Sequence, residues 1–321
     1  MNLINEFIAK ETQKGCVIRL DAKNYKDLSY NSLYDICVKI KNLGFTHLLF
    51  SCPIDIDVLA DEYYVKVLKG FIDIVKNNGL YLWIRYSANS YSYNDPEVFL
   101  NKVKPQMIGY AKICKEYNID HFVISNESSS LTSIPVNEHD DTLRSTWKTI
   151  IKEIKEVYPE VKIGMSMNYN EIAKSTIISQ LDFVGYNAYI HMSDKGLDAT
   201  LIECANTWYT DTYRQNHIKV INDIVSKYKI PVYITECGCQ PYEGRLFFTG
   251  TSSGPGIYSK EVQAKFLEAS LNVMLNEENI KGFFIFDVFG GGYNFIGNEL
   301  AEEVITNLFE EVKEDASDAK I

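Results

Sequence analysis

The feature of this sequence that most constrains its fold is an alternation of short apolar segments with longer segments of helical periodicity, which continues along most of the 321 residues. Short apolar runs bounded by turn residues are typical of strands buried on both faces, and apolar residues spaced three and four apart are typical of amphipathic helices. The predicted strands cover residues 16–20, 46–51, 80–85, 122–127, 161–167, 182–187, 232–235 and 282–287. Eight strand–helix repeats in one chain predict an α/β fold of the (β/α)8 TIM-barrel type.

No internal boundary interrupts this pattern, so we expect residues 1–321 to form a single barrel domain that ends in a polar tail at about 314–321. A doubly wound open sheet is the alternative. It would require a glycine-rich phosphate-binding turn after the first strand, where Asp21-Ala22-Lys23-Asn24 stands instead. Pro105 interrupts one helical stretch and is predicted to begin a helix.

Composition excludes several classes of partner. The net charge of -11 and the pI of about 5.1 disfavour nucleic-acid binding, and no apolar run has the length of a membrane span. The seven cysteines lie mostly in apolar contexts, and the first residues lack the features of a secretory signal. We therefore expect free thiols and a cytoplasmic location, unless a signal has been removed. Cys237 and Cys239 are too close for the usual metal knuckle, so no metal or cofactor is expected. The oligomeric state is left open.

Two glutamates follow apolar strand-like runs at distant points of the chain. Glu127 ends the fourth predicted strand and Glu236 follows the seventh. In a barrel of this kind active residues lie at the C-terminal ends of the strands, and strands four and seven face each other across the mouth. Two carboxyl groups in that arrangement are what glycoside hydrolysis requires. The alternative is that each glutamate is a charge on a surface loop.

Two motifs resemble signatures of clan A glycoside hydrolases, namely Ser125-Asn126-Glu127 and Ile234-Thr235-Glu236-Cys237-Gly238. Three further segments resemble glycoside hydrolase family 113, the β-mannanases. They are Leu181-Asp182-Phe183-Val184-Gly185-Tyr186-Asn187-Ala188-Tyr189, Val262-Gln263-Ala264-Lys265-Phe266 and Lys281-Gly282-Phe283-Phe284. The resemblance implies that Glu127 is the acid/base and Glu236 the nucleophile. It also implies that Asn126 binds the sugar 2-hydroxyl and that Tyr189 holds the Glu236 carboxylate. Tyr186 competes with Tyr189 for the last role, because strand alternation does not decide between them.

The chain departs from the clan at two points. Ser125 stands where a glycine often precedes the Asn-Glu pair, and the eighth strand has no tryptophan for stacking on a sugar. Phe286 or Phe289 could replace that tryptophan, although either could equally belong to the core.

Three further residues are candidates for substrate binding. Asp287, at the end of the eighth strand, could bind a sugar hydroxyl, and Trp208 could provide an aromatic platform. Arg85 could contact sugar, orient Glu236, or simply form an internal ion pair between strands.

The sequence therefore predicts a retaining glycoside hydrolase that cleaves a β-linked, mannan-like carbohydrate without a cofactor. One alternative is a non-catalytic carbohydrate-binding protein that has kept the barrel. Another is a barrel enzyme of different chemistry, such as a Schiff-base aldolase. An aldolase would need a lysine at a strand end, but Lys162 lies near a strand start.

Overall fold

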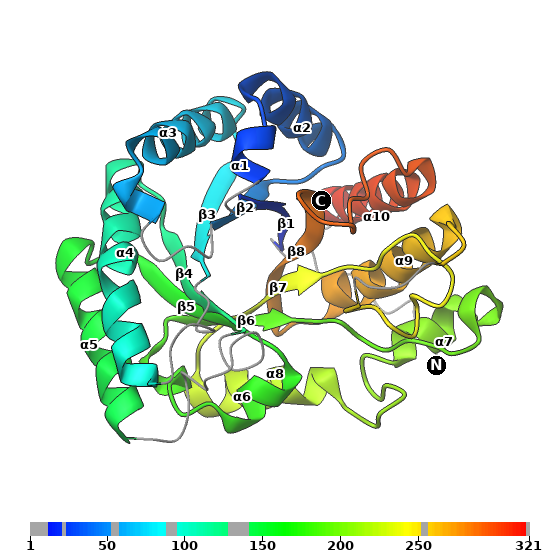
Figure 1. Cartoon of the computed structure of the whole chain (residues 1–321). Helices are drawn as coiled ribbons and strands as arrows, with labels where there is room; N and C mark the ends of the chain where they lie inside the picture. The colour runs from blue at the N-terminus through cyan, green and yellow to red at the C-terminus, as the bar shows by residue number, and fades with distance from the viewer. Residues whose placement is uncertain are drawn as a thin grey trace.

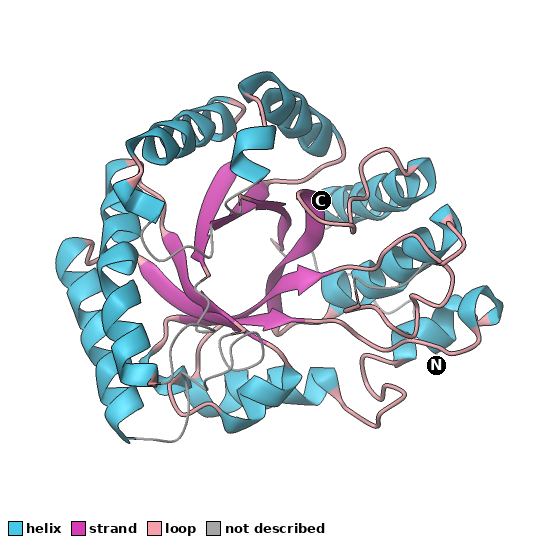
Figure 2. Cartoon of the chain, in the orientation of Figure 1, coloured by secondary structure: helices cyan, strands magenta, loops and turns pink. Residues whose placement is uncertain are grey.

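A computed structural model describes residues 12–20, 24–52, 58–87, 95–127, 141–251 and 256–318. Eight parallel strands close into a barrel in the order β1-β2-β3-β4-β5-β6-β7-β8, and helices surround it (Figures 1 and 2). The fold prediction is confirmed. The strands are β1 (Gln13–Arg19), β2 (His47–Cys52), β3 (Tyr81–Tyr86), β4 (His121–Asn126), β5 (Lys162–Met167), β6 (Phe183–Asn187), β7 (Val232–Cys237) and β8 (Ile280–Phe289).

The helices alternate with the strands as the periodicity predicted. They are α1 (Asn24–Asp27), α2 (Tyr30–Asn42), α3 (Glu62–Asn77), α4 (Pro96–Glu116), α5 (Asp141–Val157), α6 (Tyr169–Lys174), α7 (Leu201–Asn206), α8 (His217–Tyr228), α9 (Lys260–Asn276) and α10 (Glu299–Asp318). Short 3-10 turns occur at Val58–Ala60, Ile178–Gln180 and Gly196–Asp198. Helix α10 continues through Asp318, into the segment predicted as a polar tail.

The helix starts follow ordinary capping chemistry. The side chain of Asp61 accepts hydrogen bonds from the backbone at the start of α3, and Asp95 does the same for α4. Pro96 then occupies the first turn of α4, where a missing N–H costs nothing. The prediction that Pro105 begins a helix is therefore wrong, because Pro105 lies inside α4.

The inside of the barrel is filled by large side chains rather than by an open channel. The ring of Trp83 stacks on His121 at a centroid distance of 4.1 Å and packs against Phe183, Tyr233 and Phe284. Gly164 makes this packing possible, since a Cβ there would lie 2.2 Å from the Phe183 ring. The filled interior leaves the ends of the strands as the place where side chains can meet a ligand.

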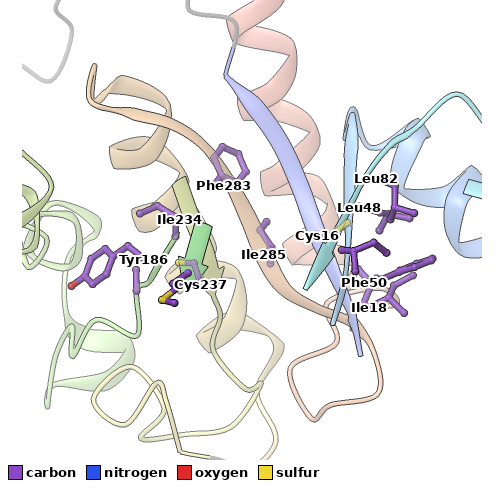
Figure 3. Close-up of a cluster of buried hydrophobic side chains, with 14 of the residues drawn as sticks. Cys16, Ile18, Leu48, Phe50, Leu82, Tyr186, Ile234, Cys237, Phe283 and Ile285 are labelled. Carbon is purple, nitrogen blue, oxygen red and sulfur yellow. The ribbon is translucent and has the colours of Figure 1, made fainter. Parts of the chain in front are cut away.

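A second apolar layer lies between the strands and the helices. Figure 3 shows side chains of this layer, among them Ile18, Phe50, Tyr186, Ile234 and Ile285, which are buried. All seven cysteines are unpaired and buried, as predicted. Within the described ranges, no helix has the length and apolar character needed to cross a membrane.

Candidate active site

The backbone around Glu127 departs from regular strand geometry. The register between β4 and β5 shifts between Val123 and Asn126, and Glu127 has a φ of 46°, which is uncommon for a residue with a side chain. The N–H of Glu127 still donates to the carbonyl of Ser166 at 2.8 Å. The sheet therefore anchors Glu127, while the bulge changes the direction of its side chain.

Glu236 on β7 is 5% exposed and its two carboxylate oxygens receive different donors. Nη2 of Arg85 lies 2.6 Å from Oε1, and the hydroxyl of Tyr189 donates to Oε2 at 2.5 Å. Charge-assisted hydrogen bonds of this length are strong and directional. They fix the orientation of the carboxylate and stabilise its negative charge.

Arg85 connects β3 to β7 through its ion pair with Glu236. Its guanidinium is 1% exposed and also donates to Oγ of Ser51 on β2, at 3.0 Å from Nη2. Direct sugar contact by Arg85 stays a prediction, since the described contacts of its guanidinium are with Glu236 and Ser51. Of the roles left open, the internal ion pair and the orientation of Glu236 are the ones that the geometry supports.

Asn187 connects the two predicted motifs. Its Nδ2 donates to Oε1 of Glu127 at 2.8 Å and to Oδ1 of Asn126 at 3.0 Å. Its own Oδ1 accepts from the hydroxyl of Thr235 at 2.9 Å. Asn187 also pairs in register with Glu236 across β6 and β7. The sequence reasoning gave Asn187 no role, although its position between Tyr186 and Tyr189 in the sixth-strand motif was a usable signal.

The two glutamates differ in their electrostatic setting. Burial and the charge of Glu236 raise the pKa of Glu127 to about 7, although the hydrogen bond from Asn187 and the charge of Arg85 act in the opposite direction. Glu236 instead has a permanent cation in direct contact. The arrangement thus favours one protonated and one ionised carboxyl group at neutral pH, which is the division of roles in glycoside hydrolysis.

The structure shows which of the two candidate tyrosines, Tyr189 or Tyr186, contacts the carboxylate of Glu236. Tyr189 contacts Glu236. The Tyr186 side chain belongs to the layer between strands and helices (Figure 3) and its hydroxyl is paired with Nδ1 of His217 on α8. Nε2 of His217 lies 3.2 Å from Oδ2 of Asp211, which completes a buried network away from the site.

Near the end of β8, the aromatic ring of Phe286 packs against two tyrosines of the site region. The ring of Phe286 packs edge-on against Tyr189 at a centroid distance of 6.4 Å and against Tyr293 at 5.4 Å, and it is 8% exposed. The guanidinium of Arg19 lies 5.9 Å from the same ring. Phe286 therefore lies beside the residue that holds Glu236.

Two side chains predicted to contact substrate are fully buried in the structure. Asp287 is 0% exposed, and its carboxylate packs so closely on Gly291 that a Cβ there would lie 2.3 Å from Oδ2. Trp208 is also 0% exposed and lies near His217, where both faces of the indole are covered. Their burial gives no support to a direct sugar contact, and both roles stay predictions. The predicted loop 128–137 lies outside the described residues.

Among the described residues, no group of three or more histidine, cysteine, aspartate or glutamate side chains is arranged to hold a metal ion.

A parallel (β/α)8 barrel with paired glutamates after the fourth strand and on the seventh defines a clan A glycoside hydrolase. The model of glycoside hydrolase family 113 matches residues 63–294, and the chain belongs to this family. It is therefore a glycoside hydrolase.

Solved structures agree with this fold. A family 113 β-1,4-mannanase superposes with a TM-score of 0.70 at 15% identity, covering 95% of this chain and 99% of the other. The family 113 β-mannanase of Alicyclobacillus acidocaldarius gives a TM-score of 0.68 at 14% identity, with 97% and 100% covered. A family 2 β-galacturonidase of Eisenbergiella tayi gives 0.63 at 15% identity, covering 94% of this chain and 51% of the other. No curated protein sequence matches the chain.

Proposed function

We propose that this glycoside hydrolase cleaves β-linked mannan with retention of configuration, with Glu127 as acid/base and Glu236 as nucleophile. The observation that carries the assignment is the contrast between the two carboxyl groups. Arg85 and Tyr189 both contact the Glu236 carboxylate, whereas burial and the neighbouring charge raise the pKa of Glu127 to about 7.

In the proposed first step, Glu236 attacks the anomeric carbon and Glu127 gives its proton to the departing glycosidic oxygen. The product is a glycosyl ester on Glu236. In the second step, the now ionised Glu127 takes a proton from water, which attacks the same carbon and releases Glu236. Arg85 and Tyr189 act by keeping the nucleophile aimed throughout. We expect the two carboxyl groups to lie roughly 5–5.5 Å apart, as in retaining enzymes.

Asn126 is proposed to bind the sugar 2-hydroxyl. Its Oδ1 already accepts from Asn187, so its amide Nδ2 remains to donate to a hydroxyl oxygen. Such a hydrogen bond strengthens in the transition state and contributes to catalysis.

The choice of mannan is supported by the family and by the structural relatives. The mannanase structures match this chain over nearly the whole length of both proteins. The eighth strand has no tryptophan, and Phe286 lies beside Tyr189, so we expect the contacts to the bound sugar ring to differ in detail from those of the clan. The seven buried free thiols support a reducing compartment for the protein.

The assignment is tested with purified protein on a panel of aryl β-glycosides, among which β-mannosides should react best. Glu127→Ala should still be glycosylated by a substrate with a good leaving group, and azide should then give the β-azide. Glu236→Ala should lose nearly all activity, and azide should give the α-azide by direct displacement. The opposite anomers would exchange the two roles, and an inverted wild-type product would overturn the retaining mechanism.

A further inference from the structure

A cluster of aromatic rings lies on the segments that follow β6 and β7. His191 and Tyr213 come from the first segment, and Phe247 and Phe248 from the second. The centroid distances are 4.7 Å between His191 and Tyr213, 5.9 Å between His191 and Phe247, and 4.6 Å between Phe247 and Phe248. Figure 1 shows both segments leaving the barrel on the same side.

The rings are carried on well-anchored backbone. The N–H of Met192 donates to the carbonyl of Leu246 at 2.8 Å, and the hydroxyl of Thr249 donates to the carbonyl of Ile190 at 3.2 Å. Leu246 and Thr249 are each 0% exposed, yet Phe248, which lies between them, is 49% exposed. Tyr213 is 54% exposed. Clustered aromatic rings held at the surface by buried neighbours are typical of binding surfaces.

The cluster adjoins the proposed active site. A methyl group placed on Gly250 would lie 3.3 Å from Cβ of Tyr189, whose hydroxyl contacts Glu236. Phe248 is two residues from Gly250, a span of at most about 7 Å along the chain. A carbohydrate chain that extends from the glutamates past Tyr189 therefore comes within reach of these rings.

We propose that Phe248 and Tyr213, supported by Phe247 and His191, bind sugar units of the polysaccharide beyond those at the two glutamates. The proposal rests on the function proposed above. Sugar rings present C–H groups on their faces and hydroxyls around their edges, so an aromatic face can bury the former while water solvates the latter. Exposed rings such as Tyr213 and Phe248 beside the proposed active site therefore suit a polymeric substrate better than a short glycoside.

The test compares Phe248→Ala and Tyr213→Ala with the wild type on a long β-1,4-manno-oligosaccharide and on an aryl β-mannoside. Each variant should lose about two- to tenfold in kcat/KM on the oligosaccharide, mainly through KM, because one ring contact is removed. The aryl substrate is too short to reach the rings, so its kcat/KM should not change. Tyr81→Ala is the control, since Tyr81 is 69% exposed, stacks on His47, and lies at the start of β3, on the opposite face.

Equal losses on both substrates, or no loss on the oligosaccharide, would overturn the aromatic site while leaving the proposed function intact. Binding provides a readout independent of turnover. In a Glu236→Gln background, calorimetry should show weaker binding of the oligosaccharide when Phe248→Ala is added, and unchanged affinity there would also refute the site. A wild type that binds the oligosaccharide through Phe248 but cleaves neither substrate would refute the proposed function alone.

Discussion

At the residue scale, the side chain of Asn187 links the two proposed catalytic motifs and influences the charge of Glu127. Its hydrogen bond to Glu127 opposes the burial that raises the pKa of that carboxyl group. Asn187→Ala should therefore move the alkaline limb of kcat/KM to higher pH, because Glu127 would keep its proton longer. Loss of a hydrogen bond to a charged group should also lower the maximal rate about 10- to 100-fold. The measurement is a pH profile of kcat/KM on an aryl glycoside.

Thr235→Val is the matched control for this prediction. It removes the hydrogen bond to Oδ1 of Asn187 but leaves the amide that faces Glu127. We expect a smaller loss of rate and a smaller shift of the limb. Since the two glutamates interact, the observed shift of the alkaline limb describes the titration of the pair rather than that of Glu127 alone. An alkaline limb that stays in place in Asn187→Ala would contradict the role given to this residue.

Asp287 offers a stability prediction at the same scale. Burial raises its pKa from 3.8 to about 7, with Glu236 adding to the shift and Arg19 opposing it. The folded state therefore binds this proton more tightly than the unfolded state, so its contribution to stability falls as pH rises from about 4 to about 7. Asp287→Asn removes this dependence. The melting temperature of the variant relative to wild type should therefore be higher at about pH 8 than at about pH 5, and thermal unfolding at both values tests this.

At the element scale, hydrophobic periodicity was sufficient to place every strand, because each strand is buried on both faces and each helix on one. It could not resolve details that depend on irregular pairing. The register between β6 and β7 shifts between Tyr186 and Asn187, so simple alternation cannot tell which tyrosine faces the site. Pro105 was misassigned because tertiary packing tolerates a proline within α4.

Side-chain roles were harder to predict than elements. The positions of Glu127 and Glu236 followed from the barrel rule, since strand ends are fixed by topology. Trp208 is of a residue type that often stacks on sugar rings, but only the folded structure shows that its side chain is buried. Burial of one aromatic side chain depends on contacts from segments distant in sequence, which no local pattern encodes.

A buried glutamine on α9 holds two loops of the C-terminal face together. Nε2 of Gln263 donates to the carbonyls of Cys239 and Tyr293, each at 2.9 Å, and its Oε1 accepts from Asn298 at 2.9 Å. Gln263→Ala removes the donor to two buried carbonyls and one acceptor of Asn298, which keeps its bond to the carbonyl of Lys260, so the free energy of unfolding should fall by about 2–4 kcal/mol. Urea denaturation measures this.

Asn276→Ala serves as the comparison on the same helix. Its side chain is exposed and donates to the carbonyl of Asn272, so its replacement should change the free energy of unfolding by less than about 0.5 kcal/mol. Equal effects of the two substitutions would show that the buried network at Gln263 contributes nothing specific.

At the scale of the whole molecule, the side chains that fill the closed barrel lie apart from the residues proposed to be catalytic. The interior is filled around Trp83, and the proposed catalytic groups lie at one end of the strands. The helices cover the strands on all sides (Figure 2), and the closed sheet has no edge at which to open. Unfolding should therefore expose most of the core together rather than one part at a time.

The seven cysteines report on this expectation, because they are distributed from β1 to the segment after β7. Burial raises the pKa of Cys37, Cys52 and Cys237 to about 12, which leaves little of the reactive thiolate at neutral pH. The native protein should therefore react very slowly with a thiol reagent. The denatured, unreduced protein should react at all seven positions, since none is in a disulfide.

If the barrel opens as one unit, native labelling should proceed at one common rate for all seven thiols, measured by mass spectrometry. Rapid labelling of one cysteine would show that its element opens locally, and fewer than seven reactive thiols after denaturation would show a covalent link between them.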